Sequence, residues 1–214
     1  MPRLLRPVLA CVLVAAAGWV QAEAEVFELD PVHTRVAFRV DHAGFSKAIG
    51  TFSGSTGTLA FDPDDWASAT LDVTIPLDSL DIGSDDWRDR VLGRAFLDAK
   101  SQPTARFVST RVEPAADGAP GTATVVGQLT LRGVTREVAL DVTLNALKRH
   151  PLTLRRTAGF SATTTLSRRD FGITAWRRLV GDPVELMIEV EAVRRRGDSP
   201  SPTPERDDAD QEPR

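Results

Sequence analysis

The stretch GQLTLRGVTREVALDV, residues 127–142, decides the fold class. Leu129 and Leu131 alternate with polar residues, and the same rhythm returns from Val138 to Val142. Successive side chains of a strand point to opposite faces, so this pattern predicts two half-buried strands joined by a turn.

We expect these strands to form a hairpin, because one register places every apolar residue on the same face and sets opposite charges against each other. That register leaves residues 133–136 as the connection and places Gly127 opposite Val142. The expected pairs are Leu131 with Val138, Leu129 with Leu140, Thr130 with Ala139 and Arg132 with Glu137.

Similar alternation recurs along the chain and predicts about eight or nine strands. Strands of this number and spacing are typical of a sandwich or a closed barrel. Small inward residues such as Gly127, Ala158 and Ala162 leave room inside a barrel, but the pattern alone does not decide between a cavity and a packed core. The expected strands lie at residues 26–29, 36–40, 59–61 and 71–77, around Phe107, at 127–132 and 137–142, and at 158–166 and 184–192.

One segment, residues 84–97, has a helical pattern instead. Ser84 is a plausible N-cap, and the two aspartates after it suit the positive end of a helix dipole. Trp87 and Val91 are four residues apart, as are Leu92 and Phe96, which is the spacing of one helix face. We therefore expect one α-helix in an otherwise antiparallel all-β chain.

The ends of the chain differ from its middle. Two arginines and an apolar run from about Val8 to Val20 predict a secretory signal peptide over residues 1–22. This run is too short to span a bilayer as a helix. The only cysteine, Cys11, lies in it, so the exported domain, residues 23–193, has no disulfide. Residues 194–214 have four prolines and no apolar period, which predicts a disordered tail.

The chain resembles the YceI-like family of exported, lipocalin-like barrels that bind polyisoprenoids. The resemblance covers nearly all of residues 26–193. One departure is visible: the family often has a histidine before the leucine of its helix, and here the pair is Val91-Leu92. The matching pieces are Asp30–Thr34, Phe38–His42, Gly44–Ser46, Gly50–Phe52, Gly57, Arg88–Asp89, Phe96–Asp98, Pro103–Phe107, Gly127–Thr135 and Arg169–Gly172.

This resemblance implies an extended eight-stranded antiparallel barrel with one helix packed across it. A long isoprenoid tail, of a quinone, a polyprenyl phosphate or a related amphiphile, would thread the apolar interior. It implies a periplasmic carrier of the kind linked to lipid transport and stress responses, with no cofactor besides the bound lipid. The residues expected to line the cavity are Phe38, Phe52, Trp87, Phe96, Phe107, Phe160 and Phe171. For each ring, packing against its neighbours is the alternative role.

Charge is distributed unevenly. The formal net charge is −4, which argues against nucleic-acid binding. Residues 61–90 have a net charge of −7, and residues 148–178 have +7. A basic rim for a pyrophosphate headgroup, with Arg168, Arg169 and Arg177 as its candidates, or for an anionic membrane surface is one interpretation. A solvated face with internal charge pairing is the simpler one. The sequence also leaves a homodimer open.

Catalytic and metal-binding motifs are weak. Asp170-Phe171-Gly172 matches a kinase triplet without its companion motifs, so we expect a binding protein rather than an enzyme. His33 and His42 could serve a haem- or metal-linked redox partner, but an odd interval places them on opposite faces of one strand. We therefore expect no metal site. A stress-induced structural protein with a filled barrel is the third alternative.

Overall fold

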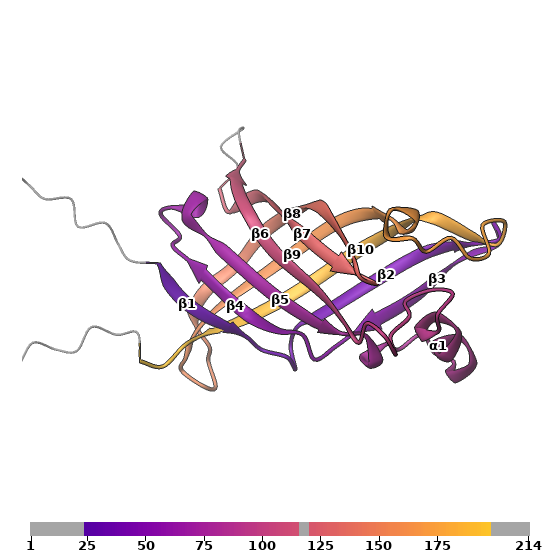
Figure 1. Cartoon of the computed structure of the whole chain (residues 1–214). Coiled ribbons are helices and arrows are strands. Elements are labelled where there is room, and N and C mark those ends of the chain that lie inside the picture. The colour runs from indigo at the N-terminus through magenta and orange to yellow at the C-terminus, as the bar shows by residue number, and fades with distance from the viewer. Residues whose placement is uncertain (1–23, 116–119, 198–214) are drawn as a thin grey trace, which may run out of the picture.

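A closed antiparallel barrel makes up the protein in a computed structural model that describes residues 24–115 and 120–197. Eight strands form the ring in the order β1-β4-β5-β6-β7-β8-β9-β10, and β10 pairs back to β1 (Figure 1). The other two strands, β2 and β3, continue from the edge of β10 and lengthen the wall on one side. The predicted eight-stranded all-β barrel with one helix is confirmed.

All the strand pairs are antiparallel, and β2 and β3 come between β1 and β4 in the chain although β1 pairs with β4. The strands are β1 (Glu25–Leu29), β2 (Arg35–His42), β3 (Ser46–Phe52), β4 (Thr56–Phe61), β5 (Thr70–Pro76), β6 (Thr104–Pro114), β7 (Thr122–Leu131), β8 (Val134–Arg149), β9 (Arg156–Ser167) and β10 (Val180–Arg194). The helices are α1 (Asp85–Leu92) and three single 3₁₀ turns, η1 (Trp66–Ser68), η2 (Leu77–Ser79) and η3 (Arg168–Phe171).

The long strand β10 is shared between the ring and the extension. Its last residues pair with β1, as in Leu29 with Ala192, and its earlier part pairs with β2, as in Phe38 with Leu186. A turn separates β1 from β2. In this turn the Asp30 carboxylate accepts a hydrogen bond from the Val32 N–H, at 2.8 Å. Because of this break, β1 of the ring and β2 of the extension pair with the same edge of β10.

The hairpin of β7 and β8 has the predicted faces but not the predicted register. Leu131 pairs with Val134 rather than with Val138, and Gly127 lies opposite Val138 rather than Val142. Arg132 and Gly133 have φ angles of 53° and 74°, so two residues make the turn in the left-handed conformation that tight hairpins favour. The expected four-residue connection is wrong. The partner strand is displaced by four residues, an even number, which is why the apolar face is unchanged.

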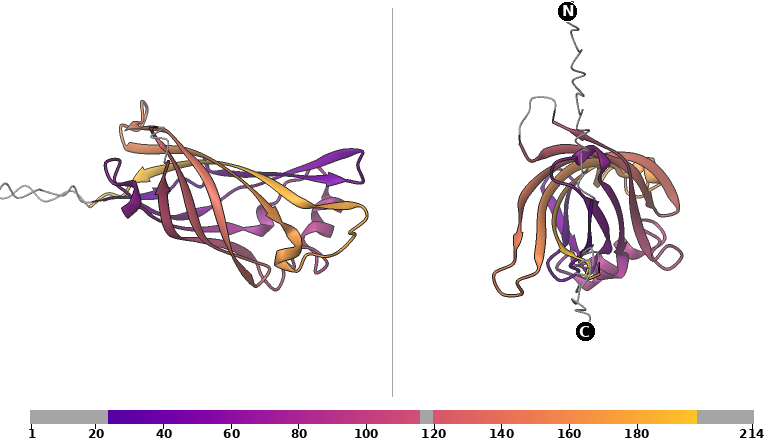
Figure 2. Two further views of the ribbon diagram at one scale, coloured as in Figure 1. Left: turned by 90° about the horizontal axis from the view of Figure 1, so that it is seen from above. Right: turned by 90° about the vertical axis from the view of Figure 1, so that its left-hand side faces the viewer.

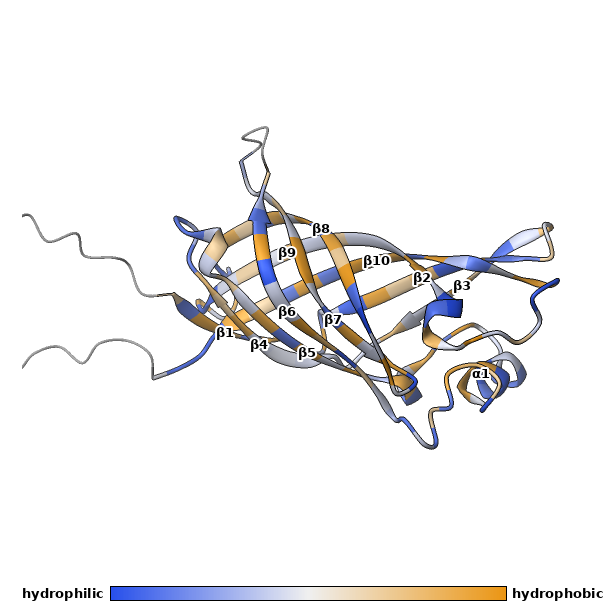
Figure 3. Ribbon diagram, turned by 45° about the horizontal axis from the view of Figure 1, so that its top comes forward, coloured by the Kyte–Doolittle hydropathy of each residue, from blue (hydrophilic) through white to orange (hydrophobic). Residues whose placement is uncertain are grey.

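Apolar and polar residues alternate along the strands, and the apolar ones face the interior (Figure 3). Aromatic rings from neighbouring strands pack against two glycines that face the interior. A Cβ atom on Gly127 would lie 2.5 Å from the Phe107 ring, and one on Gly50 would lie 2.5 Å from the Phe38 ring. Both positions therefore require glycine, because the Cβ atom of any other residue would collide with the aromatic ring.

The helix is shorter than predicted. It begins after Ser84 and ends at Leu92, and the chain then turns back through hydrogen bonds such as Leu97 N–H to Val91 carbonyl, at 3.0 Å. Gly93 follows the last helical residue, so Phe96 lies in a turn rather than on the helix. Within the described ranges, no helix is long and apolar enough to cross a membrane.

The two ends of the barrel are different in structure. We call one end the closed end; it contains the start of β1, the end of β10, η1 and the β8–β9 loop. We call the other end the mouth; it contains α1, η3 and the β2–β3 turn (Figures 1 and 2). Two of the sequence predictions, the signal peptide at 1–22 and most of the tail at 194–214, fall outside the described residues. Strand β10 runs through Arg194, the first residue of that expected tail.

Candidate ligand cavity

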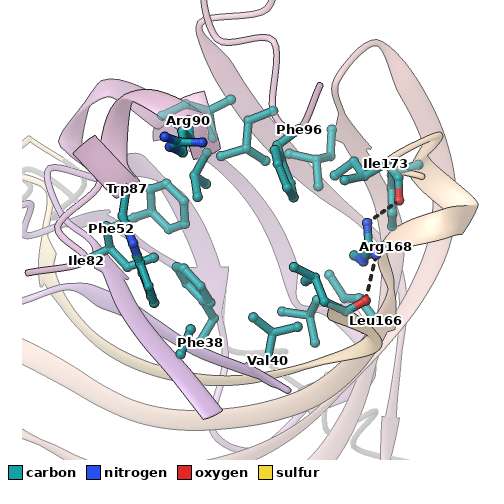
Figure 4. A pocket seen from close by; sticks show the side chains of 18 of the residues that line it. Phe38, Val40, Phe52, Ile82, Trp87, Arg90, Phe96, Leu166, Arg168 and Ile173 are labelled. Atoms are coloured by element: carbon teal, nitrogen blue, oxygen red, sulfur yellow. Dashed lines mark hydrogen bonds between the residues drawn. The ribbon is translucent and has the colours of Figure 1, made fainter. Parts of the chain in front are cut away.

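The mouth opens into an apolar chamber of about 470 Å³, the mouth chamber (Figure 4). Strands β2 and β3 supply one wall, with Phe38, Val40 and Phe52, and α1 covers the opening with Trp87. Figure 4 shows these side chains converging on a common space from several elements. Because the extension and α1 form this wall, the chamber is wider than the ring behind it.

A second chamber of about 170 Å³, the inner chamber, lies within the ring. Its lining is apolar apart from four hydroxyl residues, Thr34, Ser55, Thr70 and Thr164. Ser55 is fully buried, and its Oγ has no hydrogen-bond partner among the described residues.

The two chambers meet at a neck of five side chains that line both. They come from five strands, β2, β5, β7, β9 and β10, so they surround the barrel axis at the boundary between the two chambers. The neck residues are Val36, Ile75, Leu129, Leu166 and Leu186.

Three aromatic rings seal the closed end. Phe61 packs edge-on against Trp66 of η1, with ring centroids 5.1 Å apart, and against Phe160, at 5.5 Å. Such edge-to-face packing is the favoured geometry of aromatic pairs. The result is a cavity that is deep, apolar and open at one end.

Comparison with known proteins identifies the family. A model of the YceI-like domain matches residues 27–192.

The chain belongs to the YceI-like family.

Its relatives include the UPF0312 protein of Pectobacterium atrosepticum, 34% identical over 86% of this chain and 93% of that protein. Among solved structures, Burkholderia cenocepacia BcnA superposes with a TM-score of 0.67 at 24% identity, over 76% of this chain and 98% of BcnA. A polyisoprenoid binding domain from Saccharophagus degradans, implicated in plant cell wall breakdown, has the same fold, with a TM-score of 0.60 at 13% identity, over 81% of this chain and all of that domain.

In this YceI-like barrel, all seven aromatic residues selected from the sequence lie along the walls of the two chambers. Phe38, Phe52, Trp87, Phe96 and Phe171 line the mouth chamber, and Phe107 and Phe160 line the inner one. Two of them, Phe38 and Phe52, also pack on each other, with ring centroids 5.8 Å apart. Their role toward a ligand stays a prediction, while their position on the walls is a fact of the fold.

Sequence reasoning missed two tryptophans. Trp176 lines the mouth chamber, with its ring centroid 6.0 Å from that of Phe96, and Trp66 lines the inner chamber. Trp66 lies in η1 and Trp176 in a turn, so neither belongs to an alternating or helical pattern. Only their size and hydrophobicity could have indicated them.

The three headgroup arginines lie in different surroundings. Arg168 is 5% exposed and lines the mouth chamber, whereas Arg169 is paired with Asp182 on the surface, at 3.0 Å, and Arg177 lies exposed, outside the cavity lining. The structure therefore brings only one of them to the cavity. Arg90, which the sequence did not indicate, also lines the mouth chamber, with its guanidinium 5.7 Å from the Trp176 ring centroid.

Arg168 holds the mouth loop together. Its guanidinium donates to the backbone carbonyls of Ile173, Ala175, Val180 and Gly181, at 2.7–2.9 Å. Burial lowers the pKa of Arg168. Among the described residues no carboxylate forms an ion pair with it within 4.0 Å, and the charge of the more distant Asp182 partly offsets the effect of burial on this pKa.

The two histidines considered as metal ligands lie apart. His42 lies in the mouth chamber, with its ring 5.2 Å from that of Trp87, while His33 lies outside the barrel and bonds through Nδ1 to Asp30, at 2.8 Å. The hydrogen bond that His33 donates to the Asp30 carboxylate raises the pKa of His33, and the charge of the nearby Glu191 adds to the effect. Ligand atoms of Asp30, His33 and Glu191 lie within 4.8 Å of one another, but His42 is not part of that group.

Proposed function

We propose that the protein binds a long isoprenoid lipid, or an amphiphile of similar shape, and carries it with the tail held in the two chambers. The observation that carries this proposal is a pair of apolar chambers that follow one another along the barrel and share the neck residues, with Phe61, Trp66 and Phe160 packed together at the closed end. A deep channel of this shape suits a long, narrow, flexible apolar chain. The shared fold with a domain named for polyisoprenoid binding supports the same ligand class.

The energetics favour the tail over the headgroup as the source of affinity. Burial of each CH₂ group contributes about 0.8 kcal/mol, so a tail of many carbons gains far more than the roughly 0–1 kcal/mol of a surface ion pair. Association and ordering of the ligand offset part of this gain. We therefore expect the headgroup to orient the lipid and the tail to hold it.

The distribution of polar groups sets the orientation. The charged residues of the cavity, Asp41, Asp86, Arg90 and Arg168, line the mouth chamber, whereas the inner chamber has only hydroxyl groups. A charged or strongly polar headgroup is costly to bury without partners, so it belongs at the mouth. The tail then passes through the neck toward Phe160.

Arg168 is the strongest candidate for a headgroup contact. Its guanidinium has five N–H groups, and four hydrogen bonds to carbonyls leave one N–H for a ligand. An anionic phosphate or a quinone carbonyl could accept from it. Arg169 and Arg177 lie outside the cavity lining and are not part of this proposed contact.

The decisive experiment is mass spectrometry of an organic extract from the purified protein. We expect a prenyl lipid, retained at about one molecule per chain. An extract without lipid, together with no binding of added ubiquinone or polyprenyl phosphate, would overturn the proposal. A Soret band, or a bound metal lost in His33→Ala, would instead support the redox alternative.

Export to the periplasm is part of the same proposal, and the sequence pattern of residues 1–22, which is typical of a secretory signal peptide, supports it. N-terminal sequencing of the protein from a periplasmic fraction should give a mature chain that begins near Glu23. A full-length N-terminus in the cytoplasmic fraction would contradict this.

A further inference from the structure

We propose that the mouth end docks on a lipid bilayer that contains anionic lipids, through two adjacent turns. We call these turns the docking rim and define it as Phe45, Trp176, Arg177, Arg178 and Leu179. The inference rests on the proposed lipid-carrying function, because docking there would set the cavity against the source of its ligand.

The rim presents large apolar side chains to solvent. Phe45, at the tip of the β2–β3 turn, is 92% exposed, and Trp176 and Leu179 are each about half exposed. Isolated exposed apolar residues are common, but these three belong to turns that touch each other. Such a group of aromatic and aliphatic side chains at one tip is typical of a contact surface.

Hydrogen bonds join the two turns into one unit. The Ala43 N–H donates to the Leu179 carbonyl, at 2.6 Å, and β10 then pairs Val180 with His42. The amides of Leu179 and Val180 both donate to the Trp176 carbonyl, at 2.8 Å. The rim is therefore held in place before any membrane is met, which lowers the ordering cost of docking.

Positive charge lies beside the apolar side chains. Residues 173–181 include two arginines and no acid, and both arginines are exposed, with no carboxylate within 4.0 Å among the described residues. Of the acids near the rim, Asp182 pairs with Arg169, and Asp41 accepts a hydrogen bond from the Gly44 N–H. Tryptophan and arginine together are characteristic of membrane interfaces, and arginines attract anionic lipids.

The rim also adjoins the cavity. Trp176 belongs to both, since its ring packs near Phe96 in the wall of the mouth chamber. In Figures 1 and 2 the two turns lie at the end of the barrel opposite the start of β1 and the end of β10. A molecule docked by this rim would point its opening at the bilayer, so a tail could enter with little exposure to water.

Co-sedimentation with vesicles tests the proposal. The full exported chain is mixed with vesicles of phosphatidylcholine and phosphatidylglycerol, and with pure phosphatidylcholine vesicles for comparison. We expect binding to the anionic vesicles that weakens as salt is added, since salt screens exposed charges. Phe45→Ser should weaken it about tenfold or more, and Arg177→Ser with Arg178→Ser about 25-fold, since each arginine contributes about fivefold.

The β8–β9 loop at the closed end supplies a matched control. Leu152 and Leu154 are exposed there, and Arg149 lies beside them, so the loop has a similar composition. Leu152→Ser with Arg149→Ser should leave vesicle binding unchanged. If this control loses binding and the rim variants keep it, or if no variant of the chain binds anionic vesicles, the docking proposal is wrong.

Lipid retention separates this inference from the function on which it rests. Phe45, Arg177 and Arg178 do not line either chamber, so their variants should keep the lipid found in the organic extract of the parent protein. Retained lipid with lost vesicle binding supports docking. Retained lipid with unchanged vesicle binding overturns docking alone, and lipid absent from the parent protein as well overturns the carrier function.

Discussion

The closed end and the mouth of this barrel use similar residues for different purposes. At the closed end, a continuous ladder joins β1 to β10, ion pairs such as Glu25 with Arg156 lie across the strands, and aromatic rings fill the space. At the mouth, β2 and β3 form a laddered wall on one side only, turns and α1 complete the rest, and one buried arginine holds a loop by its carbonyls. The comparison suggests that the closed end supplies most of the stability and that the mouth supplies access.

The largest effect on stability should follow from removing one of the three aromatic rings packed together at the closed end. Phe61→Ala removes a ring that is 2% exposed and contacts two other rings, so we expect the free energy of unfolding to fall by about 3–5 kcal/mol. Denaturant unfolding measures it. Phe96→Ala at the mouth is the matched control and should cost clearly less, because Phe96 is only partly buried. Equal losses would show that stability is not concentrated at the closed end.

A block at the neck should separate the two chambers. Leu129→Trp would fill the passage, and a tail that loses about four carbons of burial would bind about 3 kcal/mol more weakly. Binding of prenyl lipids of increasing length, measured by calorimetry, should show that only the long ones are affected. Leu129→Met, which roughly conserves volume, should bind them normally. An unchanged length dependence in the tryptophan variant would mean that tails stop in the mouth chamber.

Loss of the buried arginine should loosen the mouth and spare the closed end. Arg168→Leu would leave four carbonyls without their donor, and we expect a loss of about 1–3 kcal/mol in stability. Hydrogen exchange should rise in residues 172–181 and stay low in β1 and the end of β10. Exchange that rises equally at both ends would contradict a local role for Arg168.

The smallest effect concerns the turn between β1 and β2. The raised pKa of His33 means that its charged form is favoured by folding, so this contribution is complete below pH 6.5 and is lost as the pH rises through the folded-state pKa. Burial raises the pKa of Asp30, but hydrogen bonds from His33 and nearby amides lower it overall. The NMR titration of His33 should therefore give a pKa above 6.5, and Asp30→Asn should bring it back toward that value. No difference between the two proteins would contradict the pairing.

The alternation of residues predicted which faces of the strands are apolar, but it did not predict the position of the β7–β8 turn. Alternation placed Phe107 and Phe160 on the inner wall because parity is local to each strand. The β7–β8 register depended on the left-handed conformation at Arg132, which an arginine rarely adopts and which no apolar pattern indicates.

Position along the chain also misled the interpretation of charge. The basic residues of segment 148–178 look like one patch in sequence, but β9 runs from one end of the barrel to the other between them. Arg149 and Arg155 therefore lie near the closed end, and Arg168 and Arg177 near the mouth. Only the length of a strand, which sequence boundaries define poorly, could have separated the two groups.

The edge shared by β1 and β2 on β10 has a consequence for selectivity. Around the inner chamber the strands are laddered on every side, so its girth is fixed by hydrogen bonds. Around the mouth chamber the side between β3 and β5 has, within the described residues, a single bridge, Thr51 with Asp81, and the segment that carries α1 spans the rest. If the protein carries a lipid as proposed, we expect the inner chamber to select for the thickness of the tail and the mouth chamber to accept headgroups of different size.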